Sequence, residues 1–285
     1  MLLTGKKILI LGVRAETSIA YAVARLAQQQ GAEIVLTSDN RHFKRTMSVA
    51  GRLAQPCDVL EVDVTRAEQL KAAAQDLDAR WGRVDGVLHS VTFAPPRALN
   101  GGFLNAAWSD AAITLHTTAY SFVACGRVFG PLLARAEHGS LVGMDFDSAV
   151  AWPGYDWAGV AKAGLESSCR YLAQALGAQG TRVNLVAAGP LRTPASSGVA
   201  SMAAISTHWS RRAPLGWDDT DTGPVARVAC ALLSEWMPAV TGEIVHADGG
   251  VHAVGMPWPV DGDPEPDLAH ETPPHPDRFG TTDQG

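Results

Sequence analysis

Residues 7–37, KILILGVRAETSIAYAVARLAQQQGAEIVLT, decide the fold of this chain, because the spacing of their apolar side chains changes twice. The apolar run at residues 7–11 predicts a buried strand. Apolar side chains then recur at helical spacing from Ile19 to Leu26, and Ser18 in front of them is a suitable helix N-cap. A second apolar run follows at residues 33–37. The stretch therefore predicts strand, turn, helix and strand.

The same alternation continues along most of the chain. Further strands are predicted at 59–64, 85–90, 140–145, 182–187 and 243–247, and helices at 67–81, 106–133, 155–176 and 225–234. Strands that alternate with helices predict a parallel sheet covered on both faces. We therefore predict an α/β protein with one Rossmann-type, doubly wound parallel sheet, and a single domain over residues 1–256.

Residues 194–217 interrupt this alternation. They are rich in alanine and serine and are bounded by Pro194 and Pro214. An irregular surface connection would have this composition. We expect instead a mobile lid, with one or two weak helices, over a ligand crevice.

Composition excludes several classes of protein. Hydrophobic residues make up 46% and charged residues 18%, which is typical of a soluble globular protein. The longest apolar runs are too short to span a membrane. The four cysteines are scattered, with no Cys-x-x-Cys pair and no adjacent histidine. We therefore expect no metal site, no disulfide framework and a reducing, cytoplasmic location.

The negative charge is concentrated at the carboxyl end. Residues 257–285 contain seven acids and one arginine, which accounts for the whole formal charge of −6. The same stretch holds seven of the 17 prolines and few aliphatic side chains. We expect a disordered acidic tail there. An acidic tail and a neutral body also argue against nucleic-acid binding.

The turn after the first strand has the features of a dinucleotide site. Gly12 follows that strand, and the N–H and hydroxyl of Ser18 stand at a helix start where phosphate can bind. The usual three-glycine fingerprint is absent, so an ordinary capped turn would give the same pattern.

Acidic residues follow the second and third strands. Asp39 is placed to accept the adenosine ribose hydroxyls, which favours NADH over NADPH. The basic cluster at residues 41–45 could instead bind a 2′-phosphate. Asp63 and Val64 are placed to meet the adenine ring, although a simple turn at the strand end is equally consistent with them.

Tyr155 and Lys162 are seven residues apart, close to two helical turns. On one helix their side chains would share a face, about 10 Å apart along the axis. A phenol and an ammonium so placed can hold a cofactor sugar and a substrate oxygen together. The commoner oxidoreductase arrangement has lysine four residues after tyrosine, where this chain has Gly159.

With its flanking segments, this spacing resembles the NADH-dependent enoyl-[acyl-carrier-protein] reductases, divergent members of the short-chain dehydrogenase/reductase superfamily. The likeness covers about residues 4–254. Besides the tyrosine and lysine, it rests on Gly12 with Ser18-Ile19-Ala20, His89-Ser90-Val91, Gly143-Met144-Asp145-Phe146, Gly189-Pro190-Leu191-Arg192-Thr193 and Thr241-Gly242-Glu243.

The resemblance implies hydride transfer from NADH to the β-carbon of a trans-2-enoyl thioester, carried on acyl carrier protein or coenzyme A, in a homotetramer. Tyr155 would bind the thioester oxygen, Lys162 the nicotinamide ribose, and Phe146 would pack beside nicotinamide and substrate. The other cofactor-binding positions implied are Gly12, Ser18, Ile19, Ser90, Val91, Thr92, Met144, Asp145, Pro190, Leu191 and Thr193.

Two features set this chain apart within that family. Thr92 stands where glycine is usual, and a β-branched side chain narrows backbone approach and disfavours positive φ. Residues 190–217 are shorter than in the long-chain specialists, so we expect ordinary or medium acyl chains. Two other functions are open: a dehydrogenase acting on a carbonyl or alcohol, and a catalytically silent NADH-binding protein.

Overall fold

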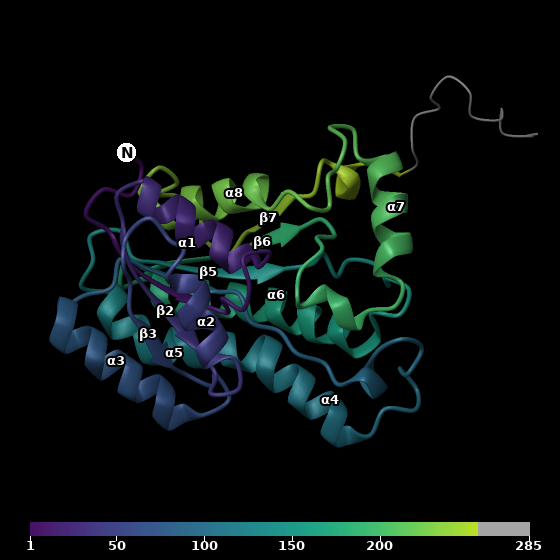
Figure 1. The fold of residues 1–285 in the computed structure, drawn as a ribbon, viewed down its shortest axis with the longest axis horizontal. Helices are drawn as coiled ribbons and strands as arrows, with labels where there is room; N and C mark the ends of the chain where they lie inside the picture. Colours follow the sequence, from purple (N-terminus) through teal and green to yellow (C-terminus); the bar gives the residue numbers. More distant parts are fainter. Residues whose placement is uncertain (256–285) are drawn as a thin grey trace, which may run out of the picture.

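The computed structural model describes residues 1–255, so the acidic tail expected at 257–285 lies outside the described residues. The sheet contains seven parallel strands in the order β3-β2-β1-β4-β5-β6-β7 (Figure 1). The strands are β1 (Lys7–Leu11), β2 (Glu33–Ser38), β3 (Val59–Glu61), β4 (Gly86–His89), β5 (Ser140–Asp145), β6 (Arg182–Ala188) and β7 (Ile244–Ala247). The α/β fold predicted from the sequence is confirmed.

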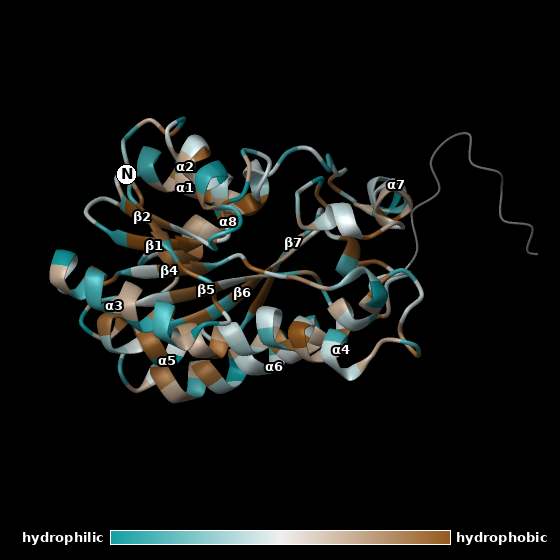
Figure 2. Ribbon diagram, turned by 60° about the horizontal axis from the view of Figure 1, so that its bottom comes forward, coloured by the Kyte–Doolittle hydropathy of each residue, from teal (hydrophilic) through white to brown (hydrophobic). Residues whose placement is uncertain are grey.

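Helices cover both faces of this sheet. One layer contains α1 (Ile19–Gln29), α2 (Phe43–Ala50) and α8 (Gly223–Leu233); the other contains α3 (Ala67–Trp81), α4 (Trp108–Leu115), α5 (Ser121–Leu133) and α6 (Asp156–Gly177). Side chains alternate along each strand between the two resulting cores. In β1, Ile8 and Ile10 pack toward α1 and α8, whereas Leu9 and Leu11 pack toward α3, α5 and α6. Figure 2 shows the hydrophobic strands lying between these helices, whose outer surfaces are more hydrophilic.

The strand order reverses between β1 and β4, and this reversal opens a crevice at the carboxyl ends of the strands. Gly12 follows β1 there with φ +101°, a conformation that other residues rarely adopt. A Cβ at this position would lie 2.0 Å from the carbonyl oxygen of Ser90, which follows β4. Glycine is therefore required for the two strand ends to approach so closely.

Three elements differ from the sequence-based expectation. The helix expected at 106–133 is divided by a π-helical segment, His116–Tyr120. The short helix α2 was missed, because it is only eight residues long and buries three of them. The strand expected at 59–64 ends at Glu61, where the pairing of this edge strand with β2 stops.

The lid segment contains a 3₁₀ turn, Ser196–Gly198, and α7 (Met202–Arg212). α7 stands apart from the two layers, beyond the carboxyl ends of the strands (Figure 1). Residues 194–217 thus contain one α-helix and one short 3₁₀ turn, where one or two weak helices were expected. Within the described residues, no helix combines the length and apolarity needed to cross a membrane.

Candidate active site

A cavity lies at the carboxyl ends of β1, β4, β5 and β6, under the lid segment. It collects most of the predicted site residues, which come from seven different parts of the chain. These lining residues are Gly12, Ser18, Ile19, Ser90, Val91, Thr92, Met144, Asp145, Phe146, Tyr155, Lys162, Pro190, Leu191 and Thr193. Asp39, Asp63 and Val64 do not line it.

Tyr155 and Lys162 both line this cavity, but only Lys162 lies within a helix. Helix α6 begins at Asp156, whose φ of +42° is left-handed, and Tyr155 is its N-cap residue. The expectation that one helix carries both side chains was therefore wrong for the tyrosine. The left-handed residue turns the chain just after Tyr155, so the tyrosine is placed by the preceding turn, in which its N–H donates to the Trp152 carbonyl oxygen at 3.1 Å.

Lys162 is held beside the carboxyl end of β5. Its side chain is buried, and Nζ donates to the carbonyl oxygen of Met144 at 2.7 Å. Nζ also lies 4.0 Å from Oδ1 of Asp145, the next residue. Neither carboxylate oxygen of Asp145 has a hydrogen-bond partner among the described residues.

Burial shifts the pKa of three groups that line the cavity, Lys162, Asp145 and Tyr155. It lowers the pKa of Lys162, although the Asp145 carboxylate acts in the opposite direction. It raises the pKa of Asp145 to about 7, against the effect of the Lys162 ammonium. Burial, followed by the negative charge of Asp145, also raises the pKa of Tyr155. Tyr155 is therefore a neutral hydrogen-bond donor at physiological pH.

The predicted phosphate-binding turn differs in detail from the expectation. The N–H of Ser18 donates to the Ala15 carbonyl oxygen at 3.0 Å, so it is not available to a phosphate. The Ser18 hydroxyl oxygen accepts from the N–H of Arg14 and of Ala15, which leaves its proton free to donate. The first hydrogen bond of α1 runs from the N–H of Tyr21 to the carbonyl oxygen of Ser18. The N–H groups of Ile19 and Ala20 come before it, at the N-terminus of the helix, where a phosphate could accept them.

Asp39 lies outside the cavity but close to it. Its carboxylate accepts the N–H of His42 at 3.0 Å and lies 3.5 Å from the guanidinium of Arg14, which does line the cavity. The Asp63 carboxylate accepts both the N–H and the hydroxyl of Thr65, as a turn at a strand end requires. Both bonds end on Oδ1, so this geometry agrees with the turn interpretation and leaves Oδ2 for the predicted contact with adenine.

Thr92 does not adopt the conformation that made its β-branched side chain a concern. The non-glycine residues with positive φ in the described chain are Asn100 and Asp156. The Thr92 hydroxyl lies 2.9 Å from that of Thr118, in the π-helical segment. The backbone conformation at position 92 therefore does not require glycine.

Sequence reasoning missed several residues of the cavity wall. The lid supplies Pro194, Ala195, Ser196 and Met202 besides the predicted Thr193, and Arg14 lies within the first turn. Apart from Met202 these residues are small, and none carries a periodic signal, so only the expected position of the lid indicated them. Arg14 could have been found from its place between Gly12 and the helix N-cap.

This sheet order, with a glycine turn after β1 and a tyrosine and buried lysine at the carboxyl edge, defines a short-chain dehydrogenase/reductase type of oxidoreductase. The chain belongs to one family within that class. The protein-family model for "Enoyl-(Acyl carrier protein) reductase" matches residues 12–252. The family predicted from the sequence is confirmed.

Curated relatives agree with this assignment. An enoyl-[acyl-carrier-protein] reductase [NADH] of Mycolicibacterium smegmatis is 41% identical over 263 residues, which cover 87% of this chain and 97% of the relative. The protein of the same name from Mycobacterium avium is 38% identical over 262 residues, with the same coverage. The Escherichia coli reductase FabI is 35% identical over 259 residues, which cover 89% of this chain and 97% of FabI.

Proposed function

We propose that this protein reduces the trans-2 double bond of enoyl thioesters with NADH, in fatty-acid synthesis. Membership of the family and the printed names of the relatives support this activity. The observation that carries it is the convergence of Tyr155 and the buried Lys162 on one cavity at the carboxyl edge of the sheet. The activity is the one predicted from the sequence.

The first turn of the sheet fits the pyrophosphate of a dinucleotide. Gly12 leaves space that a Cβ would fill, and the start of α1 presents the N–H groups of Ile19 and Ala20 with the hydroxyl proton of Ser18. Asp39, beyond Arg14, would accept ribose hydroxyls and repel a 2′-phosphate. When bound, NADH supplies the hydride.

Tyr155 would bind the oxygen of the substrate. Addition of hydride to the β-carbon places negative charge on the thioester oxygen, and protonation of the α-carbon then completes the saturated product. A neutral phenol donates its hydrogen bond to that oxygen most strongly when the charge is greatest. Because burial keeps Tyr155 protonated, the donor is present throughout the working pH range.

Lys162 would position the cofactor. One of its three N–H donors is used by the Met144 carbonyl oxygen, so two remain for the hydroxyls of the nicotinamide ribose. Its charge also favours the developing enolate. Pro190, Leu191 and Thr193 line the same cavity and would contact the nicotinamide amide.

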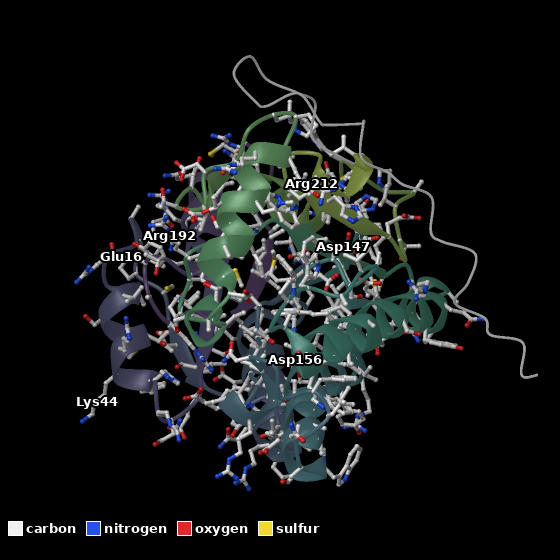
Figure 3. All side chains as sticks on the ribbon, turned by 90° about the vertical axis from the view of Figure 1, so that its right-hand side faces the viewer. Glu16, Lys44, Asp147, Asp156, Arg192 and Arg212 are labelled. Carbon is white, nitrogen blue, oxygen red and sulfur yellow. The ribbon has the colours of Figure 1, made fainter. Side chains whose placement is uncertain are left out.

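The thioester carrier is acyl carrier protein or coenzyme A, and Arg211 at the end of α7 would meet an acidic carrier. Arg211 is exposed, whereas neighbouring Arg212, which is labelled in Figure 3, donates to the carbonyl oxygen of Val254 at 2.7 Å. Replacement of Arg211 by glutamate should weaken turnover of carrier-bound substrate more than that of the coenzyme A thioester.

The proposal also includes that the protein is a homotetramer and lies in the cytoplasm. Large apolar side chains are exposed before and along α4 and α6, at Phe103, Leu104, Trp108, Val160 and Tyr171, where subunit contacts would cover them. All four cysteines are free, which fits a reducing compartment. Light scattering of the purified protein tests the tetramer directly.

The proposed activity is tested by the loss of NADH absorbance with crotonyl and decenoyl thioesters. The account predicts oxidation of NADH with both and formation of the saturated thioesters. Oxidation of NADH with acetoacetyl thioester, but not with crotonyl thioester, would favour a carbonyl reductase. Tight NADH binding without turnover of any thioester would favour a catalytically silent protein.

A further inference from the structure

Four aromatic side chains pack together beside the cavity. The Phe146 ring centroid lies 5.1 Å from that of Tyr155, 5.4 Å from Trp152 and 5.7 Å from Trp209. The rings of Trp152 and Trp209 are themselves 5.1 Å apart. Phe146 and Tyr155 line the cavity, whereas Trp152 and Trp209 do not. The two tryptophans therefore fill the space behind Phe146.

Both tryptophans are fixed by hydrogen bonds from their indole N–H groups. Trp152 donates to the carbonyl oxygen of Asp147, and Trp209 to that of Asp248, each at 2.7 Å. Trp209 is only 1% exposed. Rotation of either indole ring would leave a carbonyl oxygen without its hydrogen-bond partner. The two tryptophan side chains therefore resist displacement by a ligand.

The lid closes the cavity on another side. The side-chain oxygen of Asn100 accepts the N–H of Ala200 at 2.8 Å, and its NH₂ group donates to the carbonyl oxygen of Gly198 at 3.1 Å. The Ser206 hydroxyl in α7 is hydrogen-bonded to the carboxylate of Asp219. These hydrogen bonds tie the lid segment to the loops before α4 and α8, so its position beside the cavity is fixed.

We propose that Trp152 and Trp209 end the acyl-binding part of the site and restrict the enzyme to short and medium acyl chains, with Trp152 as the specificity-determining residue. The inference rests on the proposed function, in which the thioester oxygen is bound at Tyr155. Trp152 lies behind Phe146, with the two ring centroids 5.4 Å apart, so an acyl chain that extends from that point beyond Phe146 would meet the Trp152 ring. Trp152 is only partly buried, whereas Trp209 is fully buried. Truncation of Trp152 would therefore extend the cavity and destabilise the fold less than truncation of Trp209.

The test compares kcat/KM for trans-2-enoyl coenzyme A thioesters of four, eight, twelve and sixteen carbons. In the wild type, kcat/KM should fall for the two longest substrates. In Trp152→Ala, the ratio of kcat/KM for the twelve-carbon to that for the four-carbon substrate should rise about tenfold, as expected from about two additional buried methylene groups. The matched control is Trp236→Ala, which truncates a tryptophan that is 76% exposed.

The outcomes separate this inference from the proposed function. If the wild type fails to oxidise NADH with every enoyl thioester tested, the proposed function fails, and the inference fails with it. If the wild type is active but reduces the sixteen-carbon substrate as well as the four-carbon one, only the inference is overturned, whether or not Trp152→Ala folds. The same holds if the ratio is equal in Trp152→Ala and Trp236→Ala.

Discussion

The ammonium of Lys162 lies 4.0 Å from the carboxylate of Asp145, and both side chains are buried in the cavity wall. Burial disfavours both charges, and each charge stabilises the other. The protonation of Lys162 therefore depends on the ionisation of its neighbour, which the sequence motif alone did not reveal.

Asp145→Asn should move the alkaline limb of the kcat/KM profile to lower pH. Ionised Asp145 raises the pKa of Lys162, so the amide variant lets Lys162 lose its proton at lower pH. The profile is measured with crotonyl thioester, and Glu68→Gln on the surface of α3 is the control. An alkaline limb that stays in place would show that Asp145 does not support the charge of Lys162.

Lys162→Ala should weaken NADH binding by about 10- to 100-fold, because charge-assisted hydrogen bonds to the ribose are lost. Titration of NADH fluorescence measures the affinity. Lys71→Ala, which removes an exposed lysine of α3, should bind NADH as the wild type does. Equal affinity in Lys162→Ala and the wild type would contradict the assigned role.

A comparison of Gly12→Ala with Gly5→Ala separates the cost of a left-handed backbone conformation from the cost of a steric clash between the new Cβ and a neighbouring strand. Both glycines have positive φ, but a Cβ at Gly5 meets nothing within 4 Å, whereas one at Gly12 lies 2.0 Å from the Ser90 oxygen. Gly5→Ala should destabilise the fold by about 1–2 kcal/mol. Gly12→Ala should cost a further 1–3 kcal/mol or so and abolish NADH binding. Denaturant unfolding checks both, and equal losses would contradict the close approach.

Asn100 anchors the lid and has a φ of +58°. Asn100→Gly and Asn100→Ala both remove its bonds to the lid, so both should raise KM for the thioester to the same extent. Only Asn100→Ala adds strain, about 1–2 kcal/mol, and should therefore unfold at a lower temperature. A rise in KM confined to Asn100→Ala would show that the backbone, and not the lid contact, matters.

Much of the fold could be predicted, because buried strands and amphipathic helices repeat clearly along the chain. β5 was placed at its observed bounds, since its six residues are all buried and the turn signals around it are strong. The π-helical segment at 116–120 was not predictable, because its apolar pattern continues that of the flanking helices.

The site was predicted less completely than the fold. Motif positions identified most of the lining residues, including Tyr155 and Lys162. The use of Ser18 N–H inside its own turn, the left-handed Asp156 and the packing of Trp152 on Phe146 were not foreseen. Each depends on local backbone geometry or on contacts between distant segments, which residue spacing does not determine.

The central claim is that Tyr155 binds the substrate oxygen while Lys162 holds the cofactor, and Tyr155→Phe tests it most directly. This variant keeps the ring that packs on Phe146 and removes only the hydroxyl. The account predicts that kcat for crotonyl thioester falls by about 10²–10³-fold while NADH affinity stays at the wild-type value. Wild-type turnover in Tyr155→Phe would contradict the account.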